Sequence, residues 1–509
     1  MPSKGKPKVG KAAAMPSRRE SFPAPVYAET VLAVNFEDAK RYFLDALLEI
    51  HYAHTLMLAR QDILAREDAQ ALLRALDALD RAAISAAVYD GTFEDLFFCV
   101  EDLLAAACGE DTAGKMHTAR SRNDIDVTLY RMVLRREILK LAEALGGARQ
   151  VLLDLAAANL ETLMPAHTHT QPAQPTTLAH YLMAAVEVMG RDAERLRSAF
   201  SRVNRSPLGA CAITTTGFPI DREDTAEMLG FEGLQVNSYG AIAAVDYVTE
   251  AASVAAVTMV NLGKLVQDLL LWCTEEFGFL RLREGYVQIS SIMPQKRNPV
   301  SLEHTRILAS KALGQAQAVL TCAHNTPFGD IADSEDDLQP LVFSAFADAQ
   351  RALRLFVGLM EHAEVQRERM RHRAQGSFLT ATELADTLVR REGISFRRAH
   401  RLVSSAVRTV GAAYSPERIV KHLQRLARQL LGHSLETPAK ELLRALDPEN
   451  FVRIRSTVGG PAPSAVSAEI ERARSEISQA NAWIEQKRAL LEAYAQRLRA
   501  EATRLAKSS

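Results

Sequence analysis

The stretch SSIMPQKRNP, residues 290–299, gathers hydroxyl, amide and cationic side chains in a segment that fits neither helical nor strand periodicity. Ser290 and Ser291 stand before a turn bounded by prolines that carries Lys296 and Asn298. A serine hydroxyl is a poor base at neutral pH, and it becomes useful only where a cation, backbone N–H groups or a helix dipole stabilises its alkoxide. Lys296 could supply that cation. The pattern G-x-S-x-G is absent from the sequence, so nothing indicates a hydrolase triad.

A second polar segment, GKMHTARSRND at residues 114–124, begins like a phosphate-binding loop. Met116 stands where such a loop needs a Ser or Thr for magnesium, and no strand pattern precedes it, so nucleotide binding is not expected. The segment ends in a dense set of donors before a long helical pattern: Arg120, Ser121, Arg122 and Asn123. Arginines clamp carboxylates and a helix N-terminus favours anions. The segment fits either carboxylate binding or a helix cap flanked by surface arginines.

A third segment, HTHTQPAQP at residues 167–175, contains two histidines, and His180 follows. An HxH pair in a loop without a nearby carboxylate or cysteine is a weak zinc pattern, so no metal is expected. A hydroxyl, imidazole and amide set suits substrate binding and proton transfer better. The alternative is a plain turn before a helix that starts near Thr176, with one histidine satisfied by hydrogen bonds.

A fourth segment, TPFGDIADSEDDLQP at residues 326–340, holds five acidic residues. The D-x-D-x-D-G-x5-E spacing of a calcium loop is absent. A solvated acidic loop and a contribution to a ligand pocket both remain open at this point.

The composition is that of an ordinary soluble protein, with 48% hydrophobic residues, 24% charged residues and a net charge of −1. This near-zero charge gives no electrostatic reason to expect a nucleic-acid or membrane partner. The five cysteines are scattered, without a CxxC pair, and suit buried free thiols in a reducing cytoplasm. The most apolar stretch, about residues 251–273, is interrupted by Lys264 and Asp268, whereas a membrane span needs about 20 nearly uncharged residues.

Helical periodicity dominates the chain and predicts an all-α fold. Leu134, Ile138, Leu141 and Leu145 follow one helical face, and residues 254–271 are apolar on nearly every face, which is typical of a helix buried in a bundle. No alternating run of β-branched residues predicts a sheet. Proline and glycine clusters mark breaks near residues 165–175, 205–219, 285–299, 325–340 and 458–463.

These breaks predict the following parts: a disordered basic tail over 1–24, an N-terminal helical domain over 25–119, a central helical bundle over 120–371, a C-terminal helical domain over 372–463 and a charged helical extension over 464–509. The tail lacks the apolar core of a signal peptide, and Met15 is a second candidate start.

Taken together, several strings resemble the argininosuccinate lyase branch of the fumarase/aspartase superfamily. HTARSRND, THTQPAQP and SSIMPQKRNP match its three signature regions, and GFPIDRE at 217–223 matches a connecting segment. GSFLTATELADTLVRREGISFRRAH at 376–400 and VGGPAP at 458–463 look like its C-terminal domain. The resemblance implies a three-domain protomer with a five-helix bundle, a homotetramer with a twenty-helix core, and active sites shared by three chains.

The family chemistry is a reversible β-elimination that releases fumarate from an N-substituted aspartate, without a cofactor. By match to the motifs, Ser290 would be the base, Lys296 and Asn298 would bind the carboxylate and stabilise the alkoxide, and His169 paired to Glu303 would handle a proton or orient the substrate. The resemblance implies further substrate contacts from these residues: Ser121, Arg122, Asn123, Thr168, Gln171, Ser291, Gln295, Asp330 and Glu335.

The sequence departs from the family mainly where the leaving amine would bind. EDLFFCVE at 94–101 has Phe97 where a histidine is usual, and the late loop has Asp330, Glu335 and Leu338 where Tyr, Gln and Lys are usual. Ile289 stands where a glycine usually precedes the serine pair. Argininosuccinate or another N-succinyl amine or aminopolycarboxylate therefore remain alternatives, and a non-catalytic structural protein on this fold is a third.

Overall fold

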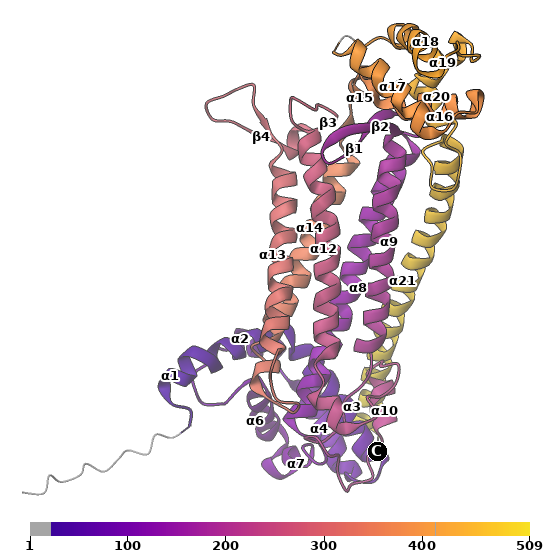
Figure 1. Ribbon diagram of the computed structural model, residues 1–509. Helices are drawn as coiled ribbons and strands as arrows, with labels where there is room; N and C mark the ends of the chain where they lie inside the picture. Colours follow the sequence, from indigo (N-terminus) through magenta and orange to yellow (C-terminus); the bar gives the residue numbers. More distant parts are fainter. Residues whose placement is uncertain (1–21, 413, 509) are drawn as a thin grey trace, which may run out of the picture. The chain divides into compact units, whose positions relative to one another are not determined.

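The computed structural model describes residues 22–412 and 414–508 (Figure 1). The chain forms two compact units, residues 22–118 together with 502–508, and residues 119–501. The predicted tail over 1–24 lies outside the described residues as far as residue 21.

The first unit is built on α3 (Leu44–Arg60), whose side chains are buried from Leu44 to Leu58 except for two positions. Around it are α1 (Pro25–Tyr27), a π-helical turn (Ala28–Leu32), α2 (Ala33–Tyr42), α4 (Arg66–Ala78), α5 (Arg81–Ala86), α6 (Leu96–Cys108) and α7 (Glu110–Lys115). The end of the last helix also belongs here. Arg74 donates to the Ala506 carbonyl at 3.0 Å and Gln70 to the Ser508 carbonyl at 2.6 Å, which satisfies carbonyls left open at a helix C-terminus.

Five long helices form the bundle of the second unit: α8 (Arg122–Ala157), α9 (Leu178–Val203), α12 (Asp246–Trp272), α13 (Val300–Ala323) and α14 (Gln339–Glu361). Each packs on the next, and α14 packs back on α8, so the ring closes (Figure 1). The four apolar residues predicted to share a face of α8, from Leu134 to Leu145, are all fully buried. The all-α class and the five-helix bundle are thereby confirmed.

Helix α12 buries one face and exposes another. Val254, Leu262 and Leu269 are buried, but Val257 and Val260 are exposed in the single chain. The helix lies in the bundle as predicted, but one of its apolar faces is not covered within a single chain. The segment Ser238–Trp272 is long and apolar enough, by length and composition, to cross a membrane, with 44% of its most apolar window buried. Its helix packs against α9, α13 and α14, as expected of a bundle helix.

Short strands occur where the sequence predicted none. The pairs are β1 (Leu163–Thr168) with β2 (Gln171–Thr177), β3 (Leu280–Arg281) with β6 (Glu364–Val365), and β4 (Gln288–Ile289) with β5 (Arg297–Asn298), all antiparallel. They lie in connections between long helices, where backbone groups have no helical partner and pair locally instead.

The smaller elements of the second unit are α10 (Arg222–Met228), α11 (Ser238–Ala243), α15 (Arg367–Gln375), and three short 3-10 turns (Glu284–Tyr286, Ala332–Ser334 and Phe378–Thr380). A separate apolar core is shared by α16 (Ala381–Glu392), α17 (Phe396–Val410), α18 (Pro416–Leu431) and α19 (Ala439–Ala445), and α20 (Pro448–Arg453) follows.

The last helix, α21 (Pro463–Lys507), packs along α8 and α9 (Figure 1). The Arg488 guanidinium donates to both oxygens of Glu143, at 2.8 and 2.6 Å, and the Trp483 ring lies 5.4 Å from the Phe200 ring. The predicted helical extension is therefore a packed part of this unit over residues up to 501.

Candidate active site

The Ser290 hydroxyl oxygen accepts hydrogen bonds from two backbone N–H groups of its own loop. Strands β4 and β5 hold the two ends of the loop together, and Ser290 follows β4 directly. Its Oγ accepts the Met293 N–H at 3.1 Å and the Ile292 N–H at 3.3 Å. Backbone N–H groups aimed at an oxygen favour its anionic form. The arrangement is therefore what a serine base requires.

The base of this loop is anchored and its tip is exposed. Arg297 donates to the Leu282 carbonyl at 2.7 Å and pairs with Glu284, and Ser301 donates to the Tyr286 carbonyl at 2.8 Å. The tip residues Ser291, Gln295 and Lys296 are exposed, and Asn298 is half-buried. Two large apolar side chains at the loop are bare to solvent, Ile289 at 67% and Ile292 at 83% exposure. A loop of this kind is suited to close over a ligand.

Thr168, His169, Thr170 and Gln171 form the turn of the β1–β2 hairpin. Thr168 pairs with Gln171, and the two residues between them have φ of +50° and +60°. Positive φ at both central positions is the geometry of a two-residue I′ turn, and it is costly for residues other than Gly, Asn or Asp. All four side chains are exposed. The expected turn is thus present, as a strained hairpin.

The predicted pair of His169 and Glu303 is not formed inside one chain over residues 22–412 and 414–508. Glu303 lies exposed in the first turn of α13 and lines a cavity of about 470 Å³ with Gln288. The pairing stays a prediction for a site to which a second chain contributes.

The other two histidines have local roles. His180 lies 2.8 Å from the Thr176 hydroxyl and 3.1 Å from the Gly459 carbonyl, so its ring is fully partnered. Burial lowers the pKa of His167, which lines a cavity of about 460 Å³ beside the hairpin. Among the described residues, no group of three His, Cys, Asp or Glu side chains could hold a metal ion.

The donor segment before α8 is organised by Asp124, which the sequence reasoning did not single out. This buried carboxylate accepts the N–H groups of Ser121 at 2.8 Å, Gly209 at 2.8 Å and Cys211 at 3.1 Å. Ser121 donates to the Asn123 side-chain oxygen at 2.5 Å, and Arg122 pairs with Asp126 at 3.0 Å. A single carboxylate thus joins the first signature segment to the loop at 209–211.

The acidic loop at residues 326–340 contacts the donor segment before α8. The Asn123 amide donates to Asp330. Burial, and then the neighbouring charge of Asp330, raises the pKa of Glu335 to about 8. A carboxyl with that pKa is mainly protonated at neutral pH and hydrogen-bonds to Asp330 as a donor. The loop therefore contains a hydrogen-bonded acid pair, Glu335 with Asp330, and is not simply a solvated acidic loop.

Leu338 and Phe97, two positions where the sequence departs from the family, are buried among apolar side chains. Leu338 is 1% exposed at the start of α14. Within the first unit, Phe97 is 3% exposed and its ring lies 5.7 Å from that of His117, which is 3.4 Å from Glu101. Among the cysteines only Cys99 is buried, and Cys322 is exposed, so the expectation of five buried thiols is wrong, although all five are free.

The predicted residues form two separate groups in one chain. Ser290 precedes α13 and the acidic loop follows it, and a 24-residue helix is about 36 Å long. In the same way, α8 with its 36 residues separates Asn123 from the hairpin of His169 (Figure 1). One end of the bundle therefore carries the base and the histidine, and the opposite end carries the arginine, the asparagine and the acid pair.

The comparisons with known proteins agree with this fold and these segments. A family model described as "Lyase" matches residues 38–314, and one described as "Argininosuccinate lyase C-terminal" matches 378–453. The chain is 44% identical over 450 residues to argininosuccinate lyase 2 of Agrobacterium fabrum, covering 88% of this chain and 89% of the relative. It is 40% identical over 441 residues to argininosuccinate lyase of Methanoculleus marisnigri, covering 86% and 88%.

Solved structures give the same result. An EDDS lyase in complex with formate superposes with a TM-score of 0.85 at 34% identity, covering 94% of this chain and 97% of the other. A class II fumarase from Schistosoma mansoni shares the fold alone, with a TM-score of 0.65 at 15% identity, covering 81% and 90%. The family models and the relatives together identify a carbon–nitrogen lyase. Within that class, the chain belongs to the argininosuccinate lyase branch of the fumarase/aspartase superfamily.

Proposed function

We propose that the protein catalyses the reversible β-elimination of argininosuccinate to arginine and fumarate. The observation that carries this proposal is the Ser290 Oγ held under two backbone N–H groups in the third signature loop. The 44% identity to argininosuccinate lyase 2 of Agrobacterium fabrum supports the substrate.

In this proposal Ser290 removes a proton from the carbon next to the substrate carboxylate. The electron pair moves onto that carboxylate, where Lys296 and Asn298 stabilise the negative charge. The C–N bond then breaks, fumarate forms, and the leaving nitrogen takes a proton. Thr168, His169 and Gln171 bind the succinyl part from the strained hairpin, and Glu303 orients the histidine.

The same proposal requires several chains for one active site. The residues at the two ends of the bundle are separated by about 36 Å along α13, so the arginine and asparagine next to a given Ser290 come from another copy. Apolar side chains exposed on α12 and α13, among them Val257, Val260 and Ile307, supply a surface for that contact. We propose that the protein is a homotetramer and that it works in the cytoplasm. The five free thiols agree with that reducing compartment.

Subunit mixing tests the shared site. A Ser290→Ala chain and an Asn123→Ala chain are each expected to be inactive alone. Refolded together, they should recover part of the wild-type turnover, because some sites then receive both native residues. A mixture as inactive as its components, with mixed oligomers present, would contradict sharing.

A second candidate is the same chemistry on another amine, and the acid pair favours it. Asp330 and Glu335 replace the Tyr and Gln usual in the family, and an EDDS lyase is structurally similar at 34% identity. Absorbance in the fumarate band decides between the two. Release of fumarate from argininosuccinate supports the first candidate. No release, together with consumption of fumarate when diamines are offered, supports the second.

A further inference from the structure

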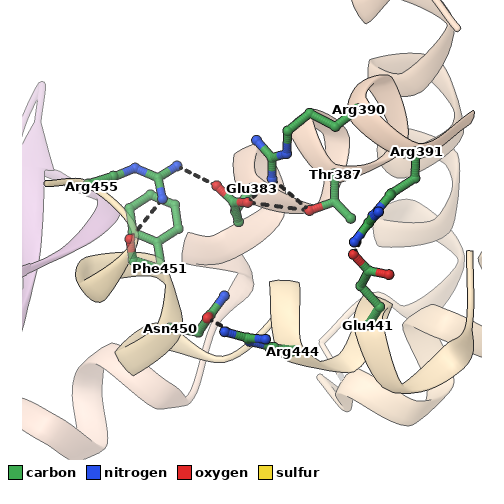
Figure 2. Close-up of polar contacts among 9 residues, drawn as sticks. All are labelled: Glu383, Thr387, Arg390, Arg391, Glu441, Arg444, Asn450, Phe451 and Arg455. Atoms are coloured by element: carbon green, nitrogen blue, oxygen red, sulfur yellow. Dashed lines mark hydrogen bonds and ion pairs between the residues drawn. The ribbon is translucent and has the colours of Figure 1, made fainter. Parts of the chain in front are cut away.

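A polar cavity of about 440 Å³ lies far from the Ser290 loop in sequence, between α16, α19 and α20. Arg390 and Arg391 project from α16, and Arg444 projects from α19 below them (Figure 2). Lys440 from α19 also lines the cavity, as do two carboxylates, Glu383 and Glu441. Four cations thus meet two anions in one small space.

The two carboxylates are already engaged. Glu383 is 3% exposed and accepts hydrogen bonds from Arg390, from Thr387 at 3.3 Å and from Arg455 at 3.0 Å (Figure 2). Glu441 pairs with Arg391 at 2.5 Å. Arginines of α16 therefore pair with both carboxylates of the cavity, Glu383 on α16 itself and Glu441 on α19.

That other wall carries Lys440 and Arg444, four residues apart on α19. The Arg444 Nε donates to the neutral side-chain oxygen of Asn450 at 3.0 Å. Over the described ranges, neither Lys440 nor Arg444 has an ion pair with a carboxylate. Like charges at this helical spacing repel each other, and a bound anion would relieve the repulsion.

We propose that this cavity binds a small aliphatic dicarboxylate. One carboxylate would lie against Lys440 and Arg444, and the other would share Arg390 and Arg391 with Glu383 and Glu441. The four cations and two carboxylates that line the cavity leave a net charge of +2, which matches a dianion.

The site has a direct connection to the candidate active site. One oxygen of Glu383 binds Arg390 and the other binds Arg455. Arg455 also lines the cavity that contains His167 and Thr170 of the hairpin. In this proposal a ligand that shares Arg390 with Glu383 would change the charge that Glu383 presents to Arg455.

Isothermal titration of the full-length protein with succinate at low salt tests the proposal. The double variant Lys440→Ser/Arg444→Gln should lose one succinate site per chain, or bind there at least about tenfold more weakly, because two charge-assisted contacts are removed. The matched control is Arg401→Gln/Lys421→Ser, which removes the same charges from exposed positions outside the cavity.

The difference between the two variants is the readout, so the result does not depend on binding at Ser290. A chain without lyase activity would show one site in the control and none in the double variant. Equal binding by the double variant and the control would overturn the proposal. Inorganic phosphate that binds the control as tightly as succinate would also overturn it, because it would reveal an unselective cationic patch.

Discussion

The acid pair of Asp330 and Glu335, in the loop before α14, makes the stability of the protein depend on pH. Burial and the charge of Asp330 raise the pKa of Glu335 from an ordinary value of 4.5 to about 8. A raised folded-state pKa means that the folded chain holds the proton more tightly than the unfolded chain does. The stabilising contribution is complete below pH 4.5 and is lost as the pH rises through 8.

The size of this effect follows from the shift and from the exposure of the side chain. A fully buried group with such a shift would contribute roughly 5 kcal/mol. Glu335 is only half-buried, so solvent screening leaves about 1–2 kcal/mol. Between pH 4.5 and 9 the wild type should lose this amount of unfolding free energy, most of it above pH 5.5. Glu335→Gln should not lose it, because its amide still donates to Asp330 and carries no charge at any pH.

Urea unfolding at several pH values from 5.5 to 9 measures the difference. Asp337→Asn is the matched control, because it removes an exposed carboxylate from the same loop. At pH 9 we expect Glu335→Gln to be more stable than the wild type, and at pH 5.5 about equal to it. Parallel pH curves for Glu335→Gln and the wild type would refute the account of the acid pair.

Three further substitutions test the supports of the site. Asp124→Ala should cost about 3 kcal/mol of unfolding free energy, because one buried and two partly buried N–H groups lose their acceptor. A thermal midpoint unchanged from the wild type would contradict this. Gly209→Ala should destabilise the protein by about 1–3 kcal/mol, since φ is +85° and a Cβ would lie 2.6 Å from Arg222 Cγ. Calorimetry measures this loss against the control Gly217→Ala, where a Cβ would meet no atom within 4 Å. Glu383→Gln should cost about 2 kcal/mol because two arginines lose their carboxylate, and faster proteolysis of residues 378–453 would reveal it, whereas an unchanged cleavage rate would count against it.

The helices were predictable because their signal is local. Apolar residues recur at helical spacing in α8 and α12, and burial of that face follows directly. The β1–β2 hairpin was missed because HTHTQPAQP has no alternation of β-branched residues, and its turn uses His169 and Thr170 where Asn-Gly is usual. The exposed side of α12 was missed because periodicity reports apolar faces without saying whether the same chain covers them.

The candidate site residues were proposed from their types, but their environments could not be predicted. The donors to the Ser290 hydroxyl are backbone groups, which the sequence does not display. The role of Asp124 depends on contacts with residues 85 and 87 positions away. The coupling of Glu335 to Asp330 depends on burial of a loop that looks solvated by composition. Local patterns name candidates, whereas long-range packing sets their pKa and their partners.

Fumarate release by Ser290→Ala tests the central claim most directly. Wild-type protein and the variant are given argininosuccinate, and absorbance in the fumarate band is followed. If Ser290 is the base, the variant should keep the same thermal midpoint and lose turnover by at least about a thousandfold, because a group that removes the proton in the rate-determining chemistry contributes on the order of several kcal/mol. Fumarate release at the wild-type rate by the folded variant would contradict the account.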